Sequence, residues 1–241
     1  MKNSKISKLS DITVAILAGG LGKRLRSKVF DRPKLLAEVG NTPFLQKLLD
    51  QLDSAGFKNI MLCIGYLGNQ IKEKFCNHYR NLDLLYSQEH IPLGTGGALR
   101  LTLPLLESEN VLVMNGDSFC DVDFEKFWQF HVSKNSKASL VVTSVSDASR
   151  FGQVKLRGDH RIIGFEEKNE QKKAGLINAG IYLIDKNLIK EIPQKKLVSI
   201  EKDVFPNWIG KAFYGYRCNH NFIDIGTPES YAQAEQFFAQ Y

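Results

Sequence analysis

The sequence predicts an α/β protein built on a mostly parallel central sheet. Short apolar runs of the kind that form buried strands recur along the first half and alternate with segments of helical periodicity. Strands that alternate with helices pair in parallel through right-handed crossovers. The 241 residues, 43% of them hydrophobic, are enough for one α/β domain with a sizeable core.

The first half is expected to hold four strands, each followed by a loop or helix. We expect strands at residues 12–17, 59–65, 82–86 and 111–114. We expect helices from Pro43 to just before Gly56, over residues 71–79 with Ile71, Phe75 and Tyr79 on one face, from Gly94 through Leu106, and after Asp123. Asp123 is interpreted as the N-cap of the last of these. His131 in that helix has no partner in the sequence and is interpreted as structural.

The pattern changes after residue 138. A strand at 139–145, a hairpin of 151–156 with 161–166 around Gly158-Asp159, and a strand at 177–184 indicate mixed or antiparallel pairing. Ser199 is expected to cap a helix, and strands are expected at 213–217 and 222–225. Thr227 and Pro228 begin the last helix.

Composition excludes several classes of protein. The net charge of +6 fits an anionic substrate, and no nucleic-acid-binding motif accompanies the charge, so no nucleic-acid partner is expected. The four cysteines show no CxxC pairing and are interpreted as reduced core thiols. Neither a signal peptide nor an apolar run of bilayer length is seen, so we expect a cytoplasmic protein without a membrane partner. The oligomeric state stays open, with a homodimer as one option.

The most informative stretch is the glycine-rich loop after the first strand. Glycines let a backbone approach a ligand closely, and successive N–H groups turned inward bind anions. Six cations crowd this loop: Lys23, Arg24, Arg26, Lys28, Arg32 and Lys34. A Walker loop is excluded because Leu17 stands where it needs Gly and Arg24 where it needs Ser or Thr. A dinucleotide-binding fingerprint is excluded because Leu25 stands where that motif needs a small residue. The loop suits a triphosphate.

Residues Leu17-Ala18-Gly19-Gly20-x-Gly22-x-Arg24-Leu25, followed by Pro33-Lys34, resemble the signature of the sugar-1-phosphate nucleotidylyltransferases. The family joins a nucleoside triphosphate to a sugar 1-phosphate and releases pyrophosphate. The resemblance implies a Rossmann-like three-layer sandwich of GT-A type, with a mostly parallel central sheet and a mixed or antiparallel extension on the sugar side. It also implies one domain over residues 1–241, with a nucleotide-binding half at about 12–135 and a sugar-binding half at about 136–241.

The resemblance also implies roles for residues along the whole chain. Asp117 and Asp224 each stand at the end of an expected strand and match the family's Mg²⁺ ligands. Catalysis is assigned to Arg24, Lys34 and Asp117. Nucleotide binding is assigned to Leu17, Ala18, Gly19, Gly20, Gly22, Lys23, Gln88, Gly94 and Thr95, with the glycines at 94–97 against the base and Gln88 at its edge. Sugar-phosphate binding is assigned to Gly152, Glu166, Lys168 and Asn178.

Within the family, segment 92–98 most resembles the D-glycero-alpha-D-manno-heptose 1-phosphate guanylyltransferases, which implies GTP as donor and GDP-heptose as product. Mannose-1-phosphate guanylyltransferases and uridylyl or thymidylyl relatives are alternatives. A glycosyltransferase of related fold is an alternative from another class, and Asp121-Val122-Asp123 has the form of its metal motif. A non-catalytic nucleotide-sensing subunit is a third. The loop from Arg26 to Pro33 and Leu35-Leu36 depart from the family pattern.

Overall fold

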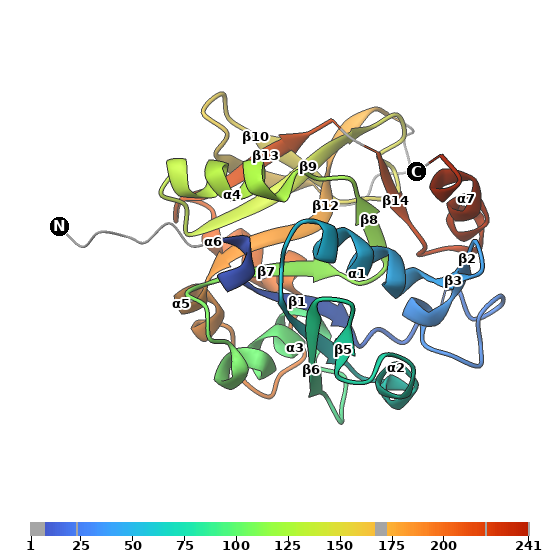
Figure 1. Ribbon diagram of the computed structural model, residues 1–241. Coiled ribbons are helices and arrows are strands. Elements are labelled where there is room, and N and C mark those ends of the chain that lie inside the picture. Colours follow the sequence, from blue (N-terminus) through green and yellow to red (C-terminus); the bar gives the residue numbers. More distant parts are fainter. Residues whose placement is uncertain (1–7, 23, 167–172, 220, 241) are drawn as a thin grey trace.

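The computed structural model describes residues 8–22, 24–166, 173–219 and 221–240. In this part of the chain a ten-stranded mixed sheet runs through the molecule with helices on both sides (Figure 1). The sheet contains β1 Thr13–Ala18, β4 Asn59–Ile64, β5 His78–Tyr79, β6 Leu82–Gln88, β7 Asn110–Asn115, β9 Ala138–Val145, β10 Gln153–Leu156, β11 Ile162–Glu166, β12 Gly175–Asp185 and β13 Phe213–Cys218.

Two small sheets and seven α-helices complete the described fold. The small sheets pair β2 Glu38–Val39 with β3 Thr42–Pro43, and β8 Ser118–Cys120 with β14 Phe222–Asp224. The α-helices are α1 Phe44–Ser54, α2 Gly68–Phe75, α3 Gly94–Thr102, α4 Phe124–Ser133, α5 Lys186–Lys190, α6 Phe205–Trp208 and α7 Pro228–Phe238. Single turns lie at Leu9–Asp11, Lys34–Leu36, Leu103–Leu105 and Ile200–Val204. None of the described helices is both long and apolar enough to cross a bilayer.

The parallel core of the sheet follows the order β7-β1-β4-β6. Its register puts Leu17 of β1 opposite Asn115 of β7 on one side and Cys63 of β4 on the other. The C-terminal ends of these strands therefore lie together at one edge, where ligands bind in open α/β sheets. This confirms the parallel half of the fold prediction.

The second half of the chain extends the same sheet with mixed pairing. Strand β12 runs antiparallel to both β7 and β9, and the β10–β11 hairpin joins the edge of β12. Strand β13 pairs parallel to β9. The predicted hairpin and the mixed extension are both present, so the fold class is confirmed.

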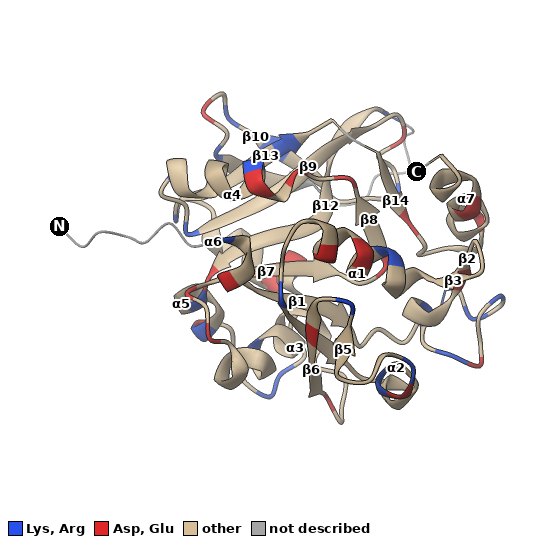
Figure 2. Ribbon diagram, in the orientation of Figure 1, with Lys and Arg blue, Asp and Glu red and all other residues tan. Residues whose placement is uncertain are grey.

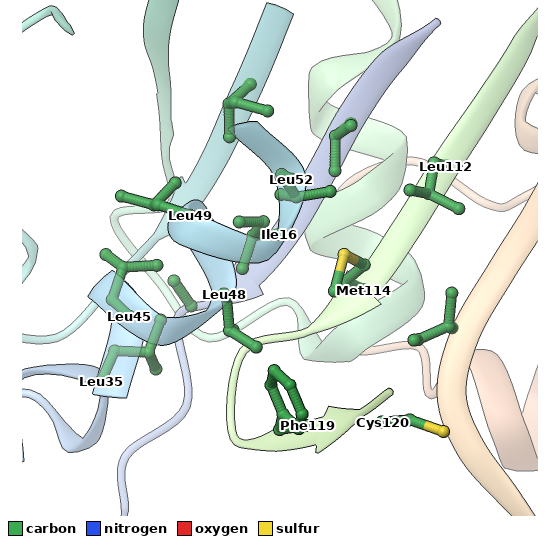
Figure 3. Packing of buried hydrophobic residues seen from close by; sticks show 14 of the residues in the cluster. Ile16, Leu35, Leu45, Leu48, Leu49, Leu52, Leu112, Met114, Phe119 and Cys120 are labelled. Carbon is green, nitrogen blue, oxygen red and sulfur yellow. The ribbon is translucent and has the colours of Figure 1, made fainter. Parts of the chain in front are cut away.

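Side chains of β1 alternate between two hydrophobic layers because successive residues in a strand face opposite sides. Val14 and Ile16 pack in the layer that includes α1, and Ala15 packs in the layer that includes α3. Figure 3 shows the first layer from close by, with four leucines of α1 lying over the strands that carry Ile16 and Met114. Both faces of the central strands are therefore covered, as three layers require.

Two local predictions are wrong. The predicted helix over residues 71–79 ends at Phe75, because Cys76 has a positive φ of 50° and breaks the helical path. Tyr79 lies in β5 instead, and its hydroxyl donates to Asp50 Oδ1 at 2.7 Å. Cys76 is also exposed, unlike Cys63 and the other two thiols, so it is no core cysteine. The chain reversal after α2, which no periodicity signals, explains both errors.

The structural interpretation of His131 is confirmed. The side chain is 3% exposed, with Nδ1 at 2.9 Å from Ser139 Oγ and Nε2 at 3.2 Å from Asn110 Oδ1. Its ring stacks on Trp128 at 5.8 Å between centroids. Burial lowers the pKa of His131 to about 4 because it disfavours the charged imidazolium.

The low pKa of His131 predicts a loss of stability in weak acid. The unfolded chain, with a histidine pKa of about 6.5, binds the proton that the folded chain excludes, so stability falls as pH drops from about 6.5 towards 4. Between pH 7.5 and pH 5 this histidine should remove about 2 kcal/mol of unfolding free energy. Urea unfolding of the wild type and His131→Gln at both pH values measures the difference. His90→Gln, at an exposed histidine, is the control. Equal pH dependence in the wild type and His131→Gln would contradict the prediction.

Candidate functional site

The glycine loop leaves the sheet directly after β1. Gly22 has a positive φ of 59°, a conformation that costs glycine little, and its carbonyl accepts from the Leu25 N–H at 2.9 Å. Leu25 is 1% exposed and holds the turn in the core, while its neighbours Arg24 and Arg26 are exposed. The buried leucine thus fixes the loop while the side chains on either side of it face solvent.

Gly116 lets the ends of β1 and β7 come close together. Its N–H donates to the Leu17 carbonyl at 3.0 Å. A Cβ at this position would lie 2.7 Å from that same oxygen and 2.7 Å from Leu35 Cδ2, so a larger residue would force the strands and the turn at Lys34–Leu36 apart. This close approach carries Asp117 to the ligand edge of the sheet.

Lys34 and Asp117 form the central ion pair of the site. Lys34 Nζ lies 2.7 Å from Asp117 Oδ2. The lysine side chain is 9% exposed and the aspartate side chain 42%, so the ammonium is the more enclosed partner. Buried Leu35 and Leu36 hold the turn that presents Lys34. An ammonium carries three donors and can bond a phosphate while it keeps the carboxylate.

Asp224 reaches the same edge from the far end of the sequence. Strand β14 pairs with β8 so that Asp224 lies opposite Ser118, and the Ile225 N–H donates to the Asp117 carbonyl at 2.9 Å. Asp224 Oδ1 accepts from the Gly226 N–H at 2.7 Å and from Ser230 Oγ at 3.3 Å. The two carboxylates predicted to hold a metal therefore come from adjacent segments.

The position of Gly226 shows how closely the predicted residues gather. A Cβ there would lie 2.5 Å from Asp224 Oδ1, 3.6 Å from Lys34 Nζ and 3.7 Å from Arg24 Nη2. Since Asp117 is bonded to Lys34, all four residues assigned to catalysis and metal binding surround one point. Figure 2 shows blue and red segments interspersed over the ribbon, and around Gly226 residues of both signs likewise lie close together.

Two cavities of about 460 and 450 Å³ open on this point. The first, called the glycine-loop cavity, is lined by Leu17, Gly19, Gly20, Leu21, Gly22, Arg24, Lys34, Leu35, Glu89, Pro92, Gly94, Thr95, Ala98, Asn115, Asp117, Leu197, Glu201 and Gly226. The second, called the hairpin cavity, is lined by Arg24, Asn115, Asp117, Ser118, Arg150, Phe151, Gly152, Phe165, Asn178, Gly180, Ser199, Glu201, Lys202, Phe205, Pro206, Phe222, Asp224 and Gly226. Both lists contain Arg24, Asn115, Asp117, Glu201 and Gly226.

Most of the residues assigned from the sequence line these cavities on the expected sides. Six of the residues assigned to nucleotide binding line the glycine-loop cavity: Leu17, Gly19, Gly20, Gly22, Gly94 and Thr95. Two of the residues assigned to sugar-phosphate binding, Gly152 and Asn178, line the hairpin cavity. Ala18 is buried in β1 and is not among the lining residues. Lys23 and Lys168 lie outside the described residues, and only the backbone of Glu166, at the end of β11, is described.

Asn178 enters the hairpin cavity through an irregularity in β12. The pairing of β12 with β9 shifts between Asn178 and Tyr182, and Gly180 there has a positive φ of 78°. The Asn178 amide bonds inside this irregularity, accepting from the Gly180 N–H at 2.8 Å and donating to the Tyr182 hydroxyl at 2.9 Å. These bonds hold the side chain in one orientation at the cavity wall.

Of the two neighbours at the end of β6, Glu89 lines the glycine-loop cavity and Gln88, which the sequence analysis placed at the base edge, does not. Gln88 ends β6 and accepts from Lys72 Nζ at 2.9 Å, and it is not among the residues that line the glycine-loop cavity. Glu89 lines that cavity, where Oε2 accepts from the Leu93 N–H at 3.0 Å. Burial raises the pKa of Glu89. Neighbouring residues face opposite ways where a strand ends, so the two side chains diverge.

The glycines at the start of α3 pack against residues 196–198. Cβ atoms at positions 94, 96 and 97 would lie 2.5 Å from the Val198 carbonyl oxygen, 2.9 Å from Val198 Cγ1 and 2.7 Å from the Lys196 carbonyl oxygen. The Gly96 N–H donates to the Val198 carbonyl at 2.8 Å. These glycines therefore permit a close backbone contact, and only Gly94 of the three lines the cavity.

The cavity residues that the sequence analysis did not assign include Glu89, Asn115, Arg150, Glu201 and Gly226. Glu89 and Asn115 carry the signal that identified Asp117, since each is a polar residue at the end of a buried strand. Glu201 accepts from the Thr95 hydroxyl at 3.0 Å and so links the helix after Ser199 to α3. No local pattern marks Glu201 or Arg150, because both reach the site through tertiary contacts.

Comparisons with known proteins agree with this geometry. The family model described as Nucleotidyl transferase matches residues 13–241. The D-glycero-alpha-D-manno-heptose 1-phosphate guanylyltransferase of Aneurinibacillus thermoaerophilus is 36% identical, over 94% of this chain and 98% of its own length. The mannose-1-phosphate guanylyltransferase of Mycobacterium tuberculosis is 32% identical, over 92% of this chain and 63% of its own length.

A solved structure shows the same architecture. The crystal structure of HddC from Yersinia pseudotuberculosis complexed with GMP-PN has a TM-score of 0.84 and 32% sequence identity, over 94% of this chain and 99% of that chain. The family match spans β1, the glycine loop and both strand-end aspartates. On this evidence the chain belongs to the nucleotidyl transferase family of enzymes.

Proposed function

We propose that this chain transfers a guanylyl group from GTP to D-glycero-alpha-D-manno-heptose 1-phosphate, giving GDP-heptose and pyrophosphate. The observation that carries the proposal is the junction of the two cavities at Arg24 and Asp117, with the glycine loop on one side and the hairpin on the other. A triphosphate in the first cavity and a sugar phosphate in the second would meet there. The relatives named for heptose and the GMP-PN complex support the finer assignment.

The reaction needs alignment and charge neutralisation more than proton transfer. A phosphate oxygen of the sugar 1-phosphate attacks the α-phosphorus in line, the P–O bond to the β-phosphate breaks, and pyrophosphate leaves. The attacking oxygen is already ionised near neutral pH, so no general base is required. The N–H groups of Gly19 to Gly22 and the Arg24 guanidinium would hold the leaving pyrophosphate. Lys34 would bond the reacting phosphates from beside Asp117.

The donor set fits a magnesium ion. Asp117 and Asp224 offer carboxylate oxygens from adjacent segments, and Mg²⁺ is usually held by one or two carboxylates together with substrate phosphates. When bound, the ion would draw charge from the α-phosphate and orient it for attack. The chain itself contributes the fixed positions of the two carboxylates, through the Gly116 contact and the β8–β14 pairing.

Glu89 is our candidate for the residue that recognises guanine. A carboxylate can accept hydrogen bonds from both the ring N–H and the exocyclic amino group of guanine, which no other common base offers together. Gly19 and Gly65 make room for it, since a Cβ on either would lie 2.8 Å from Glu89 Oε1. The Leu93 N–H orients the other oxygen. This assignment replaces Gln88, whose amide is bonded to Lys72.

A glycosyltransferase role finds less support in the geometry. Of the Asp121-Val122-Asp123 motif, Asp123 accepts from the Lys126 N–H at 3.0 Å as the N-cap of α4 and pairs with Lys126 Nζ at 2.9 Å. Neither aspartate lines the glycine-loop or the hairpin cavity. The mannose-1-phosphate guanylyltransferase reading remains the second candidate, favoured by the similarity to that enzyme of Mycobacterium tuberculosis.

The first prediction of the proposed function concerns the two carboxylates Asp117 and Asp224. Asp117→Asn and Asp224→Asn should each lower turnover by at least ~10²-fold, the scale of losing one electrostatic stabiliser of the transition state. Pyrophosphate release from GTP and the heptose phosphate under saturating Mg²⁺ measures it. Asp121→Asn is the matched control and should retain turnover. Wild-type turnover in Asp117→Asn or Asp224→Asn would show that the substituted aspartate has no catalytic role. Loss of turnover in Asp121→Asn alone would favour the glycosyltransferase function.

A second prediction separates the two neighbours at the end of β6. Glu89→Gln should lower kcat/KM for GTP by about 10-fold or more and reduce its preference over UTP, because a hydrogen-bond acceptor for guanine becomes a mixed donor and acceptor. Gln88→Ala is the matched control and should leave base preference unchanged. Steady-state kinetics with GTP and UTP decide between them. If Gln88→Ala changes the preference and Glu89→Gln does not, Gln88 is the base-reading residue.

The substrate assignment predicts a ranking of activities. We expect kcat/KM to be higher for GTP than for ATP, UTP and dTTP, and higher for the heptose phosphate than for mannose 1-phosphate. Mannose 1-phosphate should still react slowly, because it shares the manno hydroxyls and lacks only the additional CHOH group. A coupled pyrophosphate assay over the eight substrate pairs tests this. Preference for UTP or dTTP would overturn the guanylyl assignment, and preference for mannose 1-phosphate only the sugar assignment.

A further inference from the structure

Arg150 is the cation that contacts Asp224. It lies in the loop that precedes β10, and a single nitrogen, Nη2, is 3.2 Å from both carboxylate oxygens of Asp224 and 3.3 Å from Ser230 Oγ. In the strongest arginine–carboxylate pairs, two guanidinium nitrogens each donate a hydrogen bond to one carboxylate oxygen. Contact through one nitrogen is a weaker arrangement, and it leaves the rest of the fork free for a second anion.

Asp224 is held in place by groups other than Arg150. The Gly226 N–H at 2.7 Å and Ser230 Oγ at 3.3 Å both donate to its Oδ1. The Asp224 side chain is 16% exposed, whereas that of Arg150 is 43% exposed. Because the carboxylate has bonds that survive the loss of the arginine, it keeps its position when Arg150 leaves. The exposed guanidinium is therefore the partner with room to move.

The surroundings of Arg150 keep its charge beside the hairpin cavity. Its guanidinium carbon lies 5.6 Å from the ring centroid of Phe151, and that ring packs edge-on against Phe222 at 5.5 Å. All three side chains line the hairpin cavity. A cation over an aromatic face is stabilised without hydrogen bonds. Arg150 can thus give up Asp224 and remain in the wall of the cavity.

The second ion pair of the site is of a different kind. Lys34 contacts Asp117 at 2.7 Å and its side chain is 9% exposed, so it has little room to leave. An ammonium can also share its three donors between a carboxylate and a phosphate. Of the two cation–carboxylate pairs that the described residues form in the site, the Arg150 pair is the one that combines a single-nitrogen contact with an exposed cation.

We propose that Arg150 is a displaceable counterion of Asp224 and a phosphate-binding residue of the hairpin cavity. Without a metal it neutralises the carboxylate; when a divalent cation takes Asp224, the guanidinium is released to bind the phosphate of the sugar 1-phosphate. The two ligands are then coupled, and each raises the affinity of the chain for the other by the same factor. The identity of the phosphate ligand rests on the proposed function, whereas the competition for Asp224 does not.

The competition between Arg150 and a divalent cation for Asp224 is tested by titrating the full chain with Mn²⁺. Electron paramagnetic resonance measures the free Mn²⁺ and so gives the binding affinity. Arg150→Gln should bind Mn²⁺ at least about threefold more tightly than the wild type, because a competing cation has been removed. Arg157→Gln, which removes the same charge from a surface pair with Asp159, is the matched control and should bind Mn²⁺ like the wild type. Weaker Mn²⁺ binding by Arg150→Gln would overturn the proposal, since Arg150 would then be positioning Asp224 for the metal. Equal tightening by Arg157→Gln would overturn it as well.

The coupling is tested by calorimetry with the heptose phosphate and mannose 1-phosphate, each with and without Mn²⁺. Mn²⁺ should raise sugar-phosphate affinity in the wild type, and Arg150→Gln should lose that increase and bind about 10-fold more weakly or worse in Mn²⁺. Arg150→Lys, which keeps the charge, should restore part of the increase. An equal effect of Mn²⁺ in the wild type and Arg150→Gln would overturn the proposal. If neither sugar phosphate binds the wild type, the proposed function fails, and the Mn²⁺ measurement still decides whether Arg150 competes for Asp224.

Discussion

The ion pair between Lys34 and Asp117 joins the two segments on which the rest of the site depends. Lys34 comes from the loop that follows β1, and Asp117 comes from the turn that follows β7. These strands are neighbours in the parallel core, so a bond between their loops fixes the ligand edge of the sheet. The close contact of Gly116 with the Leu17 carbonyl makes the bond geometrically available. Asp117 of this pair lines both cavities, and Lys34 lines the glycine-loop cavity.

Charge compensation explains why the remaining side chains lie where they do. An isolated buried charge is costly, and the two aspartates of the site each have a cation beside them: Lys34 for Asp117 and Arg150 for Asp224. Arg24 adds a positive charge, with Nη2 3.7 Å from a Cβ position at Gly226. The described residues that line the two cavities include four cations and four carboxylates: Arg24, Lys34, Arg150 and Lys202, and Glu89, Asp117, Glu201 and Asp224. An enzyme whose nucleophile is already ionised needs this arrangement of charges more than it needs a base.

Glycines serve two different purposes in this fold. In the loop after β1, Gly22 adopts a positive φ and the neighbouring glycines line the glycine-loop cavity, as expected of a phosphate-binding loop. At the start of α3, the glycines instead allow Lys196 and Val198 to pack against the helix backbone. The second group indirectly supports the cavity, because Thr95 between them bonds Glu201 at its wall. Both groups look alike in the sequence, and only the contacts distinguish them.

The sequence by itself determined the features that depend on neighbouring residues. Short apolar runs predicted the buried strands, and Asp123 and Ser199 were correctly identified as caps. Asp117 and Asp224 were singled out because each stands at the end of a strand and matches the family pattern. The tertiary structure decided what depends on segments far apart in the chain. In the folded chain Glu89, and not Gln88, lines the glycine-loop cavity, and Arg150 contacts Asp224. A side chain's direction at a strand end, and the partner of a loop cation, follow from packing and charge pairing across the fold, which no local pattern records.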